Sequence, residues 1–542
     1  MKKLIPLFAF FFCLQTMAQQ EDAWIFLKDK PSSATYLATP LTMLSQRALD
    51  RRSKQSISLD LKDVPIETTY YSQIKGTTGI TVLAKSKWLN AIHVQGTKAI
   101  IDGLKTAFSF VESIEFANNT LNAKIRTSVK QVESTHINKF ATTATTFNYG
   151  NARNQIEMLK GDVLHQNGYT GSGMQIAVID AGFPNVNTLA AFKRLRDNNQ
   201  ILGGYDFVDR NTNFYTGHNH GTNVLSDIAG YIDGQFIGTA PDASFYLFRT
   251  EDAANEVPLE ESLWVEAAER ADSLGVDIIN TSLGYTTFDN ANYNYTYADM
   301  DGKTTFITRG AEIGVSRGML LVNAIGNDGN KTWKYMGAPA DATSVFSIGA
   351  VDASGTIAGF SSFGPTSDNR VKPDVLAQGQ SVYVINHSSG TAVTSNGTSF
   401  SSPVMAGVVA CFWQAFPNLT NAQIMQRIRE SADRFSNPHV QYGYGIPNFE
   451  NAYNTVLSLE EFATFEKIRV FPNPVNNQFT ITISNNQLQE YEIKIFNVLG
   501  KKVFENKKNT SNEIDVSSLK NGMYLLQIKN GNQLKTLKLI KK

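Results

Sequence analysis

Cysteine is almost absent from this chain of 542 residues, which contains only Cys13 and Cys411. Cys13 lies in an N-terminal segment that we expect to be removed, so the mature chain has one thiol and no internal disulfide. A protein without disulfides depends on its core for stability, and a content of 42% apolar and 11% aromatic residues is ample for a large one. Cys411 lies in the apolar run 407–412, which predicts a buried structural thiol and not a nucleophile.

Net charge is absent as well, because 49 Lys and Arg balance 49 Asp and Glu. A general binder of nucleic acid or of membrane surfaces would need a basic excess, so both classes are disfavoured. The balance is not uniform along the chain, since residues 467–542 hold thirteen Lys and Arg against five Asp and Glu. This basic segment is therefore a separate module. At roughly 150 residues per domain, the length predicts three to four domains.

Apolar runs approach membrane-spanning length only near the N-terminus. Two lysines precede an apolar run over 4–14, and Thr16-Met17-Ala18 follows it. This order is typical of a secretory signal peptide over 1–18, cleaved after Ala18. The run is shorter than the ~20 apolar residues that a membrane span needs. We therefore expect a protein that is secreted or lies at the cell surface, with no transmembrane segment in the mature chain.

The segment 19–116 alternates short strands with helices, which predicts a compact α+β domain. A Thr- and Ala-rich tract then loses apolar periodicity, which indicates a linker over 117–147. The expected strands are 23–28, 69–71, 79–84 and 110–116, and the expected helices are 41–55 and 96–107.

Residues 148–456 change to apolar, β-rich runs that alternate with helical segments. Such strands predict an α/β domain with a doubly wound, mostly parallel sheet flanked by helices. Ligands bind these sheets beyond the carboxyl ends of the strands. The expected strands are 175–179, 201–207, 244–248, 276–280, 319–324 and 346–351, and the expected helices are 189–196, 221–231, 261–274 and 402–416.

A second linker is expected over 457–466, before the basic segment 467–542. That segment has short strands at intervals of about ten residues, separated by Asn and Gly turn signals. The spacing, without a helical period, predicts a small all-β sandwich. The expected strands are 479–483, 491–496, 503–504, 523–528 and 534–540.

Four polar residues near the ends of the predicted strands and helices suit acyl transfer. Asp180 ends a strand, and His220 opens a His-Gly-Thr run. Asn327 follows a strand, and Ser399 precedes a helix. A serine hydroxyl needs an imidazole base, and the base needs a carboxylate that fixes its tautomer. The oxyanion needs preplaced donors, which an Asn amide and a backbone N–H at a helix start supply.

The chain order Asp180, His220, Asn327, Ser399 resembles that of the subtilisin-like serine peptidases, or subtilases. The motifs His220-Gly-Thr-x-Val, Ala-x-Gly-Asn327 and Gly-Thr-Ser399-x-Ser-x-Pro are similar to signatures of that family. The resemblance implies a subtilisin-like fold in which Ser399 attacks the scissile carbonyl and His220 transfers the proton. Asp180 would orient His220, and Asn327 would hold the oxyanion.

The same resemblance implies a serine endopeptidase that acts on protein or peptide substrates. The segment Ser282-Leu283-Gly284 is similar to the family's substrate-binding strand. No organic cofactor is implied. The family allows a structural calcium ion, but the sequence assigns no metal site, and Asp299-x-Asp301-Gly lacks the other oxygens of a calcium loop.

Several alternatives can be weighed. Ala181 follows Asp180 where the family commonly has Ser or Thr, and Asn223 stands where it often has a second His; neither position performs proton transfer. His218 is a rival base, but Gly-Thr does not follow it. An α/β-hydrolase would need Gly-x-Ser-x-Gly and another chain order, and a metallopeptidase would need His-Glu-x-x-His. A non-catalytic surface adhesin on the same scaffold is the alternative function.

Both flanking domains resemble known modules. In the C-terminal segment, FPNP, GKKV, DVSSL and NGMYLLQI resemble the sorting domain of the type IX secretion system of Bacteroidetes-type bacteria. That resemblance makes the secretion machinery a partner; the alternative is an accessory carbohydrate- or protein-binding sandwich. In the N-terminal segment, LSQRALDRR and SKWLNAI resemble regions that precede secreted bacterial peptidases. We expect a removable propeptide there, and a permanent accessory domain is the alternative.

Overall fold

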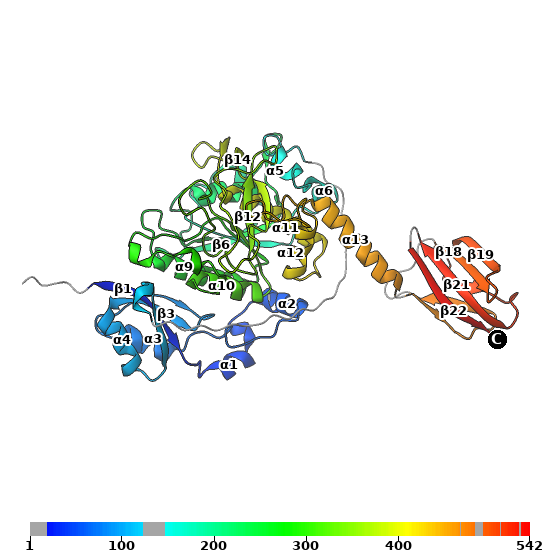
Figure 1. The fold of residues 1–542 in the computed structure, drawn as a ribbon, viewed down its shortest axis with the longest axis horizontal. Coiled ribbons are helices and arrows are strands. Elements are labelled where there is room, and N and C mark those ends of the chain that lie inside the picture. The colour runs from blue at the N-terminus through cyan, green and yellow to red at the C-terminus, as the bar shows by residue number, and fades with distance from the viewer. Residues whose placement is uncertain (1–18, 123–146, 467, 483–490, 510, 531–532) are drawn as a thin grey trace, which may run out of the picture. The chain divides into compact units, whose positions relative to one another are not determined.

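The computed structural model describes residues 19–122, 147–466, 468–482, 491–509, 511–530 and 533–542 (Figure 1). The expected signal peptide and most of the expected linker over 117–147 lie outside these residues. The chain divides into two compact units, Met1–Glu450 and Asn451–Lys542. The first unit contains an N-terminal α+β domain packed on a larger α/β domain.

The N-terminal domain is a four-stranded antiparallel sheet in the order β2-β3-β1-β4, with α3 and α4 against one face. Ile25 and Ile92 are fully buried on that face. On the other face, Trp24 stacks on Phe306 of the α/β domain with ring centroids 4.6 Å apart. The central strand is therefore buried on both faces. The elements are β1 (Gln20–Leu27), α1 (Ser33–Ala38), η1 (Pro40–Thr42), α2 (Gln46–Lys54), α3 (Thr68–Lys75), β2 (Thr81–Ser86), β3 (Ala91–Thr97), α4 (Lys98–Ala107), β4 (Val111–Phe116) and η2 (Asn119–Leu121).

Among the elements of this domain that differ from the sequence-based prediction are α3 and β3. Residues 69–71, predicted as a strand from their β-branched and aromatic side chains, lie in α3. There Tyr70, Tyr71 and the buried Ile74 pack on the core at helical spacing, so tertiary packing overrides local propensity. Strand β3 is missing from the prediction because His93 interrupts its apolar pattern, yet His93 is only 1% exposed.

The α/β domain is built on a seven-stranded sheet whose neighbouring pairs are all parallel. Its order is β13-β12-β11-β10-β5-β9-β6, so the chain first runs from β5 towards one edge and then from β10 towards the other. The reversal places a crevice at the carboxyl ends of β5 and β10. The strands are β5 (Gln175–Asp180), β6 (Ile201–Asp206), β9 (Ser244–Arg249), β10 (Ile278–Thr281), β11 (Leu320–Ala324), β12 (Phe346–Val351) and β13 (Val375–Gln378).

Helices cover both faces of this sheet. Helices α8 and α11 pack together and contact it on one side, whereas α9 and α10 form a pair that lies between the sheet and the N-terminal domain (Figure 1). The fold class is thus the predicted one. The remaining elements are α5 (Arg153–Glu157), α6 (Asp162–Gln166), η3 (Ala190–Phe192), α7 (Lys193–Asp197), α8 (His220–Ala229), β7 (Tyr231–Ile232), β8 (Phe236–Ile237), α9 (Pro258–Leu274), η4 (Ala291–Tyr293), η5 (Tyr297–Asp299), α10 (Phe306–Ser316), β14 (Val382–Ile385), β15 (Ala392–Ser395), α11 (Thr398–Ala415) and α12 (Asn421–Glu430).

The second unit is a sandwich of two antiparallel sheets, in the orders β16-β17-β20 and β19-β18-β21-β22. Both sheets contribute to one core, for example through Phe479 and Leu526. The residues expected to form a linker over 457–466 continue helix α13 (Phe449–Glu466). The strands are β16 (Arg469–Phe471), β17 (Gln478–Thr482), β18 (Tyr491–Asn497), β19 (Lys502–Asn509), β20 (Glu513–Asp515), β21 (Gly522–Asn530) and β22 (Gln533–Lys541).

The FPNP motif covers part of the last strand of this sandwich. The side-chain amide of Asn473 donates to the Lys538 carbonyl at 2.7 Å and accepts from the Ile540 N–H at 2.9 Å. Val475 then pairs with β22 through the backbone, donating to the Ile540 carbonyl at 2.7 Å and accepting from the Lys542 N–H at 2.8 Å. The Asn473 side chain and the Val475 backbone thus occupy hydrogen-bonding groups on the outer side of the edge strand β22.

Candidate active site

The site lies at the crevice between β5 and β10. Asp180 is the last residue of β5 and is 1% exposed. Its Oδ1 accepts hydrogen bonds from the Ala181 backbone at 2.7 Å and from His220 Nδ1 at 2.8 Å. Its backbone carbonyl accepts from Thr250 N at 3.1 Å. The carboxylate is therefore fixed by the sheet and holds the imidazole through one nitrogen, which leaves Nε2 for another partner.

His220 reaches Asp180 because helix α8 begins directly beside the end of β5. A methyl group at Gly221 would lie 2.4 Å from the Gly182 carbonyl oxygen and 3.0 Å from Asp180 Cβ. Only glycine allows this approach, so the His-Gly pair of the motif has a steric cause. The rival base His218 is exposed, and its Nδ1 accepts from the His220 backbone N–H at 3.3 Å.

The pKa of His220 is raised above its ordinary value. Burial alone would lower it, but the charge of Asp180 and the hydrogen bond that His220 donates to that carboxylate outweigh the burial. The imidazolium that proton transfer would create is thus stabilised in place.

Ser399 lies in the first turn of α11, which begins at Thr398, four residues before the predicted start. Pro403 is consequently inside the helix and not in its first turn as predicted. Because Pro403 has no N–H, the Ser399 carbonyl lacks its normal helical donor. The Ser282 hydroxyl takes that place at 2.8 Å, and the Ser399 hydroxyl donates to the Ser282 carbonyl at 3.2 Å. The missing N–H of Pro403 thus leaves the Ser399 carbonyl available to the Ser282 hydroxyl, which joins the start of α11 to the residue that follows β10.

The residue that follows Ser399 lies near the imidazole of His220. The His220 ring is 5.8 Å, between centroids, from the ring of Phe400, the residue after Ser399. In the described residues, the Ser399 hydroxyl donates to the Ser282 carbonyl and not to His220. Bonds of this kind often form only when substrate binds.

Asn327 follows β11 and faces the start of the same helix. Its Oδ1 accepts from Thr398 N at 2.8 Å and from Thr398 Oγ1 at 3.0 Å. This arrangement orients the amide and leaves Nδ2 as a donor beside Gly397, whose positive φ places it in a conformation that favours glycine. In the described residues, the Ser399 N–H has no hydrogen-bond partner either. Asn327 Nδ2 and the Ser399 N–H are therefore two donors at the start of α11 that have no partner among the described residues.

The segment Ser282–Leu283–Gly284 continues from β10 past Ser399. Ser282 is 5% exposed, Leu283 is half-buried and Gly284 is exposed. The next residue, Tyr285, pairs with Ala338 and anchors the segment. No hydrogen bond to the Gly284 backbone is present in the described part of the chain, so that backbone can pair with an added strand.

Sequence reasoning missed one carboxyl group at this edge. Glu251 follows β9 and accepts from the Tyr285 hydroxyl at 2.6 Å and from Thr250 Oγ1 at 3.0 Å. Desolvation raises its pKa to about 8, although the Tyr285 hydrogen bond opposes the shift. Its signal in the sequence is only that charged residues follow a buried strand.

Metal ligands are not grouped in the described ranges: no three or more His, Cys, Asp and Glu side chains lie together so as to hold an ion. Asp299 accepts from the Thr296 N–H and hydroxyl, and Asp301 accepts from the Lys303 N–H at 3.0 Å. Both carboxylates of the Asp-x-Asp-Gly sequence thus serve local turns.

Comparison with known proteins assigns the family. Residues 171–446 match the model of the subtilase family, more than half of the chain. The chain is 33% identical over 304 residues to subtilisin NAT of Bacillus subtilis subsp. natto and to subtilisin E of Bacillus subtilis (strain 168), covering 55% of this chain and 70% of each relative. It is 32% identical to a subtilisin of Bacillus pumilus, over 97% of that relative. The chain therefore belongs to the subtilase family of serine peptidases.

The flanking domains match models as well. Residues 22–135 match the peptidase S8 propeptide domain of Bacteroidota, and residues 469–542 match the secretion system C-terminal sorting domain. Both predicted resemblances are thus confirmed. The sorting domain makes this a protein of the type IX route, secreted or at the cell surface. Within the described residues, no helix has the length and apolar character of a membrane span.

Proposed function

We propose that the protein is a secreted serine endopeptidase that hydrolyses peptide bonds through Asp180, His220 and Ser399. The observation that carries the proposal is the 2.8 Å bond between His220 Nδ1 and Asp180, next to a serine at a helix start. Neither a surface adhesin nor a structural scaffold needs a buried carboxylate that fixes one nitrogen of a half-exposed imidazole.

The proposed chemistry uses these side chains as follows. Ser399 Oγ attacks the scissile carbonyl while His220 Nε2 accepts its proton, and Asp180 stabilises the imidazolium. The oxyanion takes hydrogen bonds from Asn327 Nδ2 and from the Ser399 N–H. His220 returns the proton to the leaving amine, which gives an acyl-enzyme. Water, activated by His220, then releases the acid and restores Ser399. No step uses a cofactor; calcium would serve stability alone.

The substrate binds in this proposal as an extended strand beside Ser282–Leu283–Gly284. Main-chain pairing with the exposed Gly284 supplies affinity, and alternate side chains enter pockets on either side. Because backbone pairing tolerates many sequences, we expect broad endopeptidase activity. A peptide-library profile that showed one strictly required cleavage sequence would contradict this part of the proposal.

The N-terminal domain acts, in our proposal, as a propeptide that assists folding and is removed by cleavage near 142–151. Parallel sheets fold slowly because their contacts are non-local, so a preformed surface helps to assemble them. The ring of Phe147 packs edge-on against His165, which favours a cut before Phe147. N-terminal sequencing should place the start of the mature wild type there, and the Ser399→Ala protein should keep the domain attached. A mature N-terminus at Gln19 would refute this role.

A fluorophosphonate probe tests the central proposal. The processed wild type should be labelled at Ser399, and Ser399→Ala should not be labelled. The matched control is Ser401→Ala, because Ser401 lies in the same helix turn but is fully buried and bonds to the Thr398 carbonyl. A correctly folded, processed wild type without a label on Ser399 would favour the adhesin alternative.

A further inference from the structure

Glu251 lies at the carboxyl edge of the sheet and has no part in the proposed proton transfer. It follows β9 directly, and the preceding Thr250 N–H donates to the Asp180 carbonyl at 3.1 Å. Glu251 Oε1 accepts from the hydroxyl of Tyr285 at 2.6 Å, and Tyr285 comes directly after Gly284 of the proposed substrate-binding segment. These bonds hold Glu251 beside both the proposed triad and the segment along which the substrate would lie.

One oxygen of this carboxyl group is left without a donor. Thr250 Oγ1 donates at 3.0 Å to Oε1, the same atom that Tyr285 binds. Oε2 has no hydrogen-bond partner among the described residues. The side chain is half-buried and Oε2 is not enclosed, so a group that arrives from solvent can reach it.

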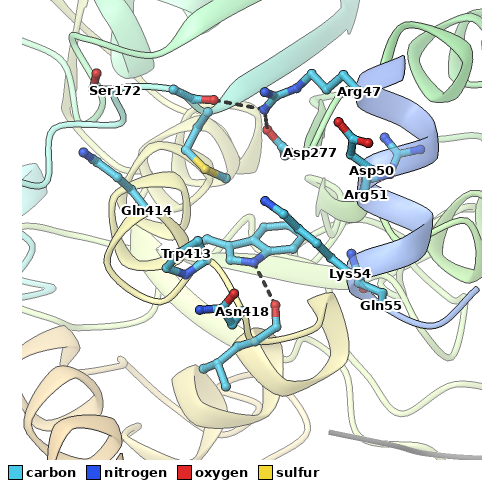
Figure 2. Close-up of a pocket in the computed structure, with 14 residues that line it drawn as sticks. Arg47, Asp50, Arg51, Lys54, Gln55, Ser172, Asp277, Trp413, Gln414 and Asn418 are labelled. Carbon is cyan, nitrogen blue, oxygen red and sulfur yellow. Dashed lines mark hydrogen bonds and ion pairs between the residues drawn. The ribbon is translucent and has the colours of Figure 1, made fainter. Parts of the chain in front are cut away.

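The described part of the chain supplies no cation for Glu251. Residues 250–269 and 271–302, which include the loop after β9 and the segment after β10, contain no Lys or Arg. At the other edge of the sheet, by contrast, Figure 2 shows Arg47 extended from α2 towards Asp277, with which it forms an ion pair. A half-buried carboxylate without a cation is costly. Glu251 therefore suits a positive charge that arrives with the substrate.

A second carboxyl group makes the same kind of bond where nothing can reach it. Glu261 of α9 accepts from the Tyr295 hydroxyl at 2.7 Å, and desolvation raises its pKa to about 8, as it does for Glu251. Glu261 is fully buried, whereas Glu251 is half-buried. The two residues thus share a tyrosine partner and a raised pKa, and they differ in access. Glu261 is a matched control for any role that requires contact with substrate.

We propose that Glu251 is a specificity-determining residue, which binds a basic side chain of the substrate close to the scissile bond. This inference rests on the proposed peptidase function. Successive side chains of an extended strand point to opposite sides, and in this arrangement one set turns towards Glu251. A Lys ammonium or an Arg guanidinium donates to Oε2 while Tyr285 holds Oε1. The result is a preference and not a strict requirement, because main-chain pairing still supplies affinity.

The preference should depend on pH, because Glu251 must lose its proton to pair with a cation. The titratable groups that face it are Tyr285, Glu256, Glu260, Asp180 and His220. Desolvation is the main cause that raises the pKa of Glu251 to about 8; the Tyr285 hydrogen bond opposes it, and the charges of Glu256 and Asp180 add to it. The carboxyl group is therefore mostly neutral well below pH 8 and ionised above it. The preference for a basic side chain should strengthen as pH rises.

Paired peptides test the proposal directly. Internally quenched peptides carry either arginine or its neutral isostere citrulline at each position near the scissile bond, and mass spectrometry identifies the bond that is cut. At pH 9, kcat/KM of the wild type should be about 10–100-fold higher for arginine at one position. At pH 6.5 the ratio should be below about fivefold, since little of Glu251 is ionised. A ratio near one at pH 9 for every position would overturn the proposal.

Two variants assign the preference to a residue. Glu251→Gln keeps the shape of the side chain and should reduce the ratio at pH 9 to within about twofold of one, because the charge is lost. Glu261→Gln should keep the wild-type ratio at both pH values, because its side chain is fully buried. A preference that survives in Glu251→Gln, or that is lost equally in Glu261→Gln, would show that another group recognises the cation.

Tyr285→Phe gives an independent readout. The Tyr285 hydrogen bond lowers the pKa of Glu251, so its removal should raise that pKa and move the rise of the arginine preference to higher pH. The ring can keep its stacked position 6.0 Å from Phe288. A rise that stays at the wild-type pH would mean that a group other than Glu251 sets the preference.

Fluorophosphonate labelling separates this inference from the proposed function. Rates are normalised to the fraction of Ser399 that takes the label. A folded protein that takes no label and cuts no peptide would refute the peptidase function, whereas a labelled protein that cuts arginine and citrulline peptides equally would refute only the role of Glu251. If Glu251→Gln does not fold, the wild type still decides the question, because a ratio that does not rise between pH 6.5 and 9 contradicts the proposal.

Discussion

Two groups of carboxylates, one beside the candidate active site at the carboxyl edge of the seven-stranded sheet and one at the amino edge where the strands begin, have opposite kinds of partner. At the carboxyl edge, Asp180 bonds to an imidazole, and Glu251 bonds to hydroxyl groups. No Lys or Arg forms an ion pair with either one in the part of the chain that the structure describes. At the amino edge, Asp272 and Asp277 each meet arginines of α2.

This difference distinguishes carboxylates that can take part in catalysis from carboxylates that hold the N-terminal domain in place. Carboxylates without a cation keep their capacity to move protons or to stabilise a transient charge, and desolvation raises the pKa of Glu251 to about 8. Carboxylates paired with buried arginines instead fix two surfaces to one another. Since the two groups lie at opposite edges of the same sheet, each edge should be alterable without effect on the other.

The largest expected effect is at the carboxyl edge. Ser399→Ala should reduce kcat by about 10⁶, the scale known for subtilisin itself. The melting temperature of the uncleaved protein should stay within a few degrees of that of an uncleaved wild type, because the hydroxyl makes only one 3.2 Å bond. Steady-state kinetics and calorimetry measure the two quantities. A large loss of stability would show that the edges are coupled.

Asp272→Asn gives the corresponding test of the amino edge. It leaves Arg51 and Arg52 buried with reduced compensation, and we expect a loss of about 3–5 kcal/mol in the free energy that holds the N-terminal domain. Chemical denaturation of the Ser399→Ala protein, with and without this change, measures it. The mature enzyme made from the same variant should keep its kcat, which is the contrasting half of the comparison.

Asn327 contributes a donor and an acceptor, and two variants separate them. Asn327→Asp keeps the oxygen that accepts from Thr398 but loses the N–H donor, whereas Asn327→Leu loses both. Each should lower kcat by about 10²–10³, a range known from subtilisin, with little change in KM. A loss confined to KM would reject the oxyanion role. Lower thermal stability is expected only for Asn327→Leu.

The raised pKa of His220 predicts where activity fails in acid. A raised pKa means that the protonated, inactive imidazole forms at a higher pH than for an ordinary histidine with a pKa of 6.5. The acid limb of kcat/KM should therefore have its midpoint above pH 6.5, with a tenfold fall per pH unit below it. Desolvation raises the pKa of Glu251 to about 8, so this group is largely uncharged on the acid limb, and Glu251→Gln should leave the midpoint nearly unchanged. A large shift of the midpoint to lower pH would show that Glu251 carries a charge beside His220 in this range.

The smallest expected effect is at Arg47, the partly exposed arginine of α2. Arg47→Ala removes a pair in which the arginine is 39% exposed, so we expect a loss of less than about 1 kcal/mol in unfolding free energy. Denaturation at low and high salt measures it, and the difference from the wild type should shrink as salt rises. An effect as large as that of Asp272→Asn would mean that the buried ion pairs of Asp272 stabilise the contact no more than the partly exposed pair of Arg47 does.

The sequence was most informative where one physical signal dominated. Continuous apolar runs predicted β5, β11 and β12 because both faces of those strands are buried. Asp180 and His220 are hydrogen-bonded to one another and Ser399 lies at the start of α11, while the catalytic role of the three residues stays a prediction. Strand β3 was not predicted, because His93 interrupts its apolar pattern, and its polar partners Asp22 and Ser262 are far away in the sequence.

Other features depended on contacts between distant segments. The pattern of α2 showed a charged helix, and no local signal could tell that Arg51 and Arg52 would be buried against Asp272. The early start of α11 depends on Ser282, 117 residues away, which supplies the donor that Pro403 lacks. The sequence pattern therefore fails mainly to predict which polar groups, far apart in the chain, will bond to one another.

The side-chain amide of Asn473 affects whether sorting domains can pair with one another when many copies are exported together. An exposed strand edge is a template for pairing with other chains. Over 538–542, however, the hydrogen-bonding groups of β22 are occupied by Asn473 and Val475 of the same chain. A second sorting domain cannot add a strand there until this cover is displaced. Two prolines flank Asn473, and neither has a backbone N–H to donate. The segment that lies on β22 therefore has few free donors with which another strand could pair.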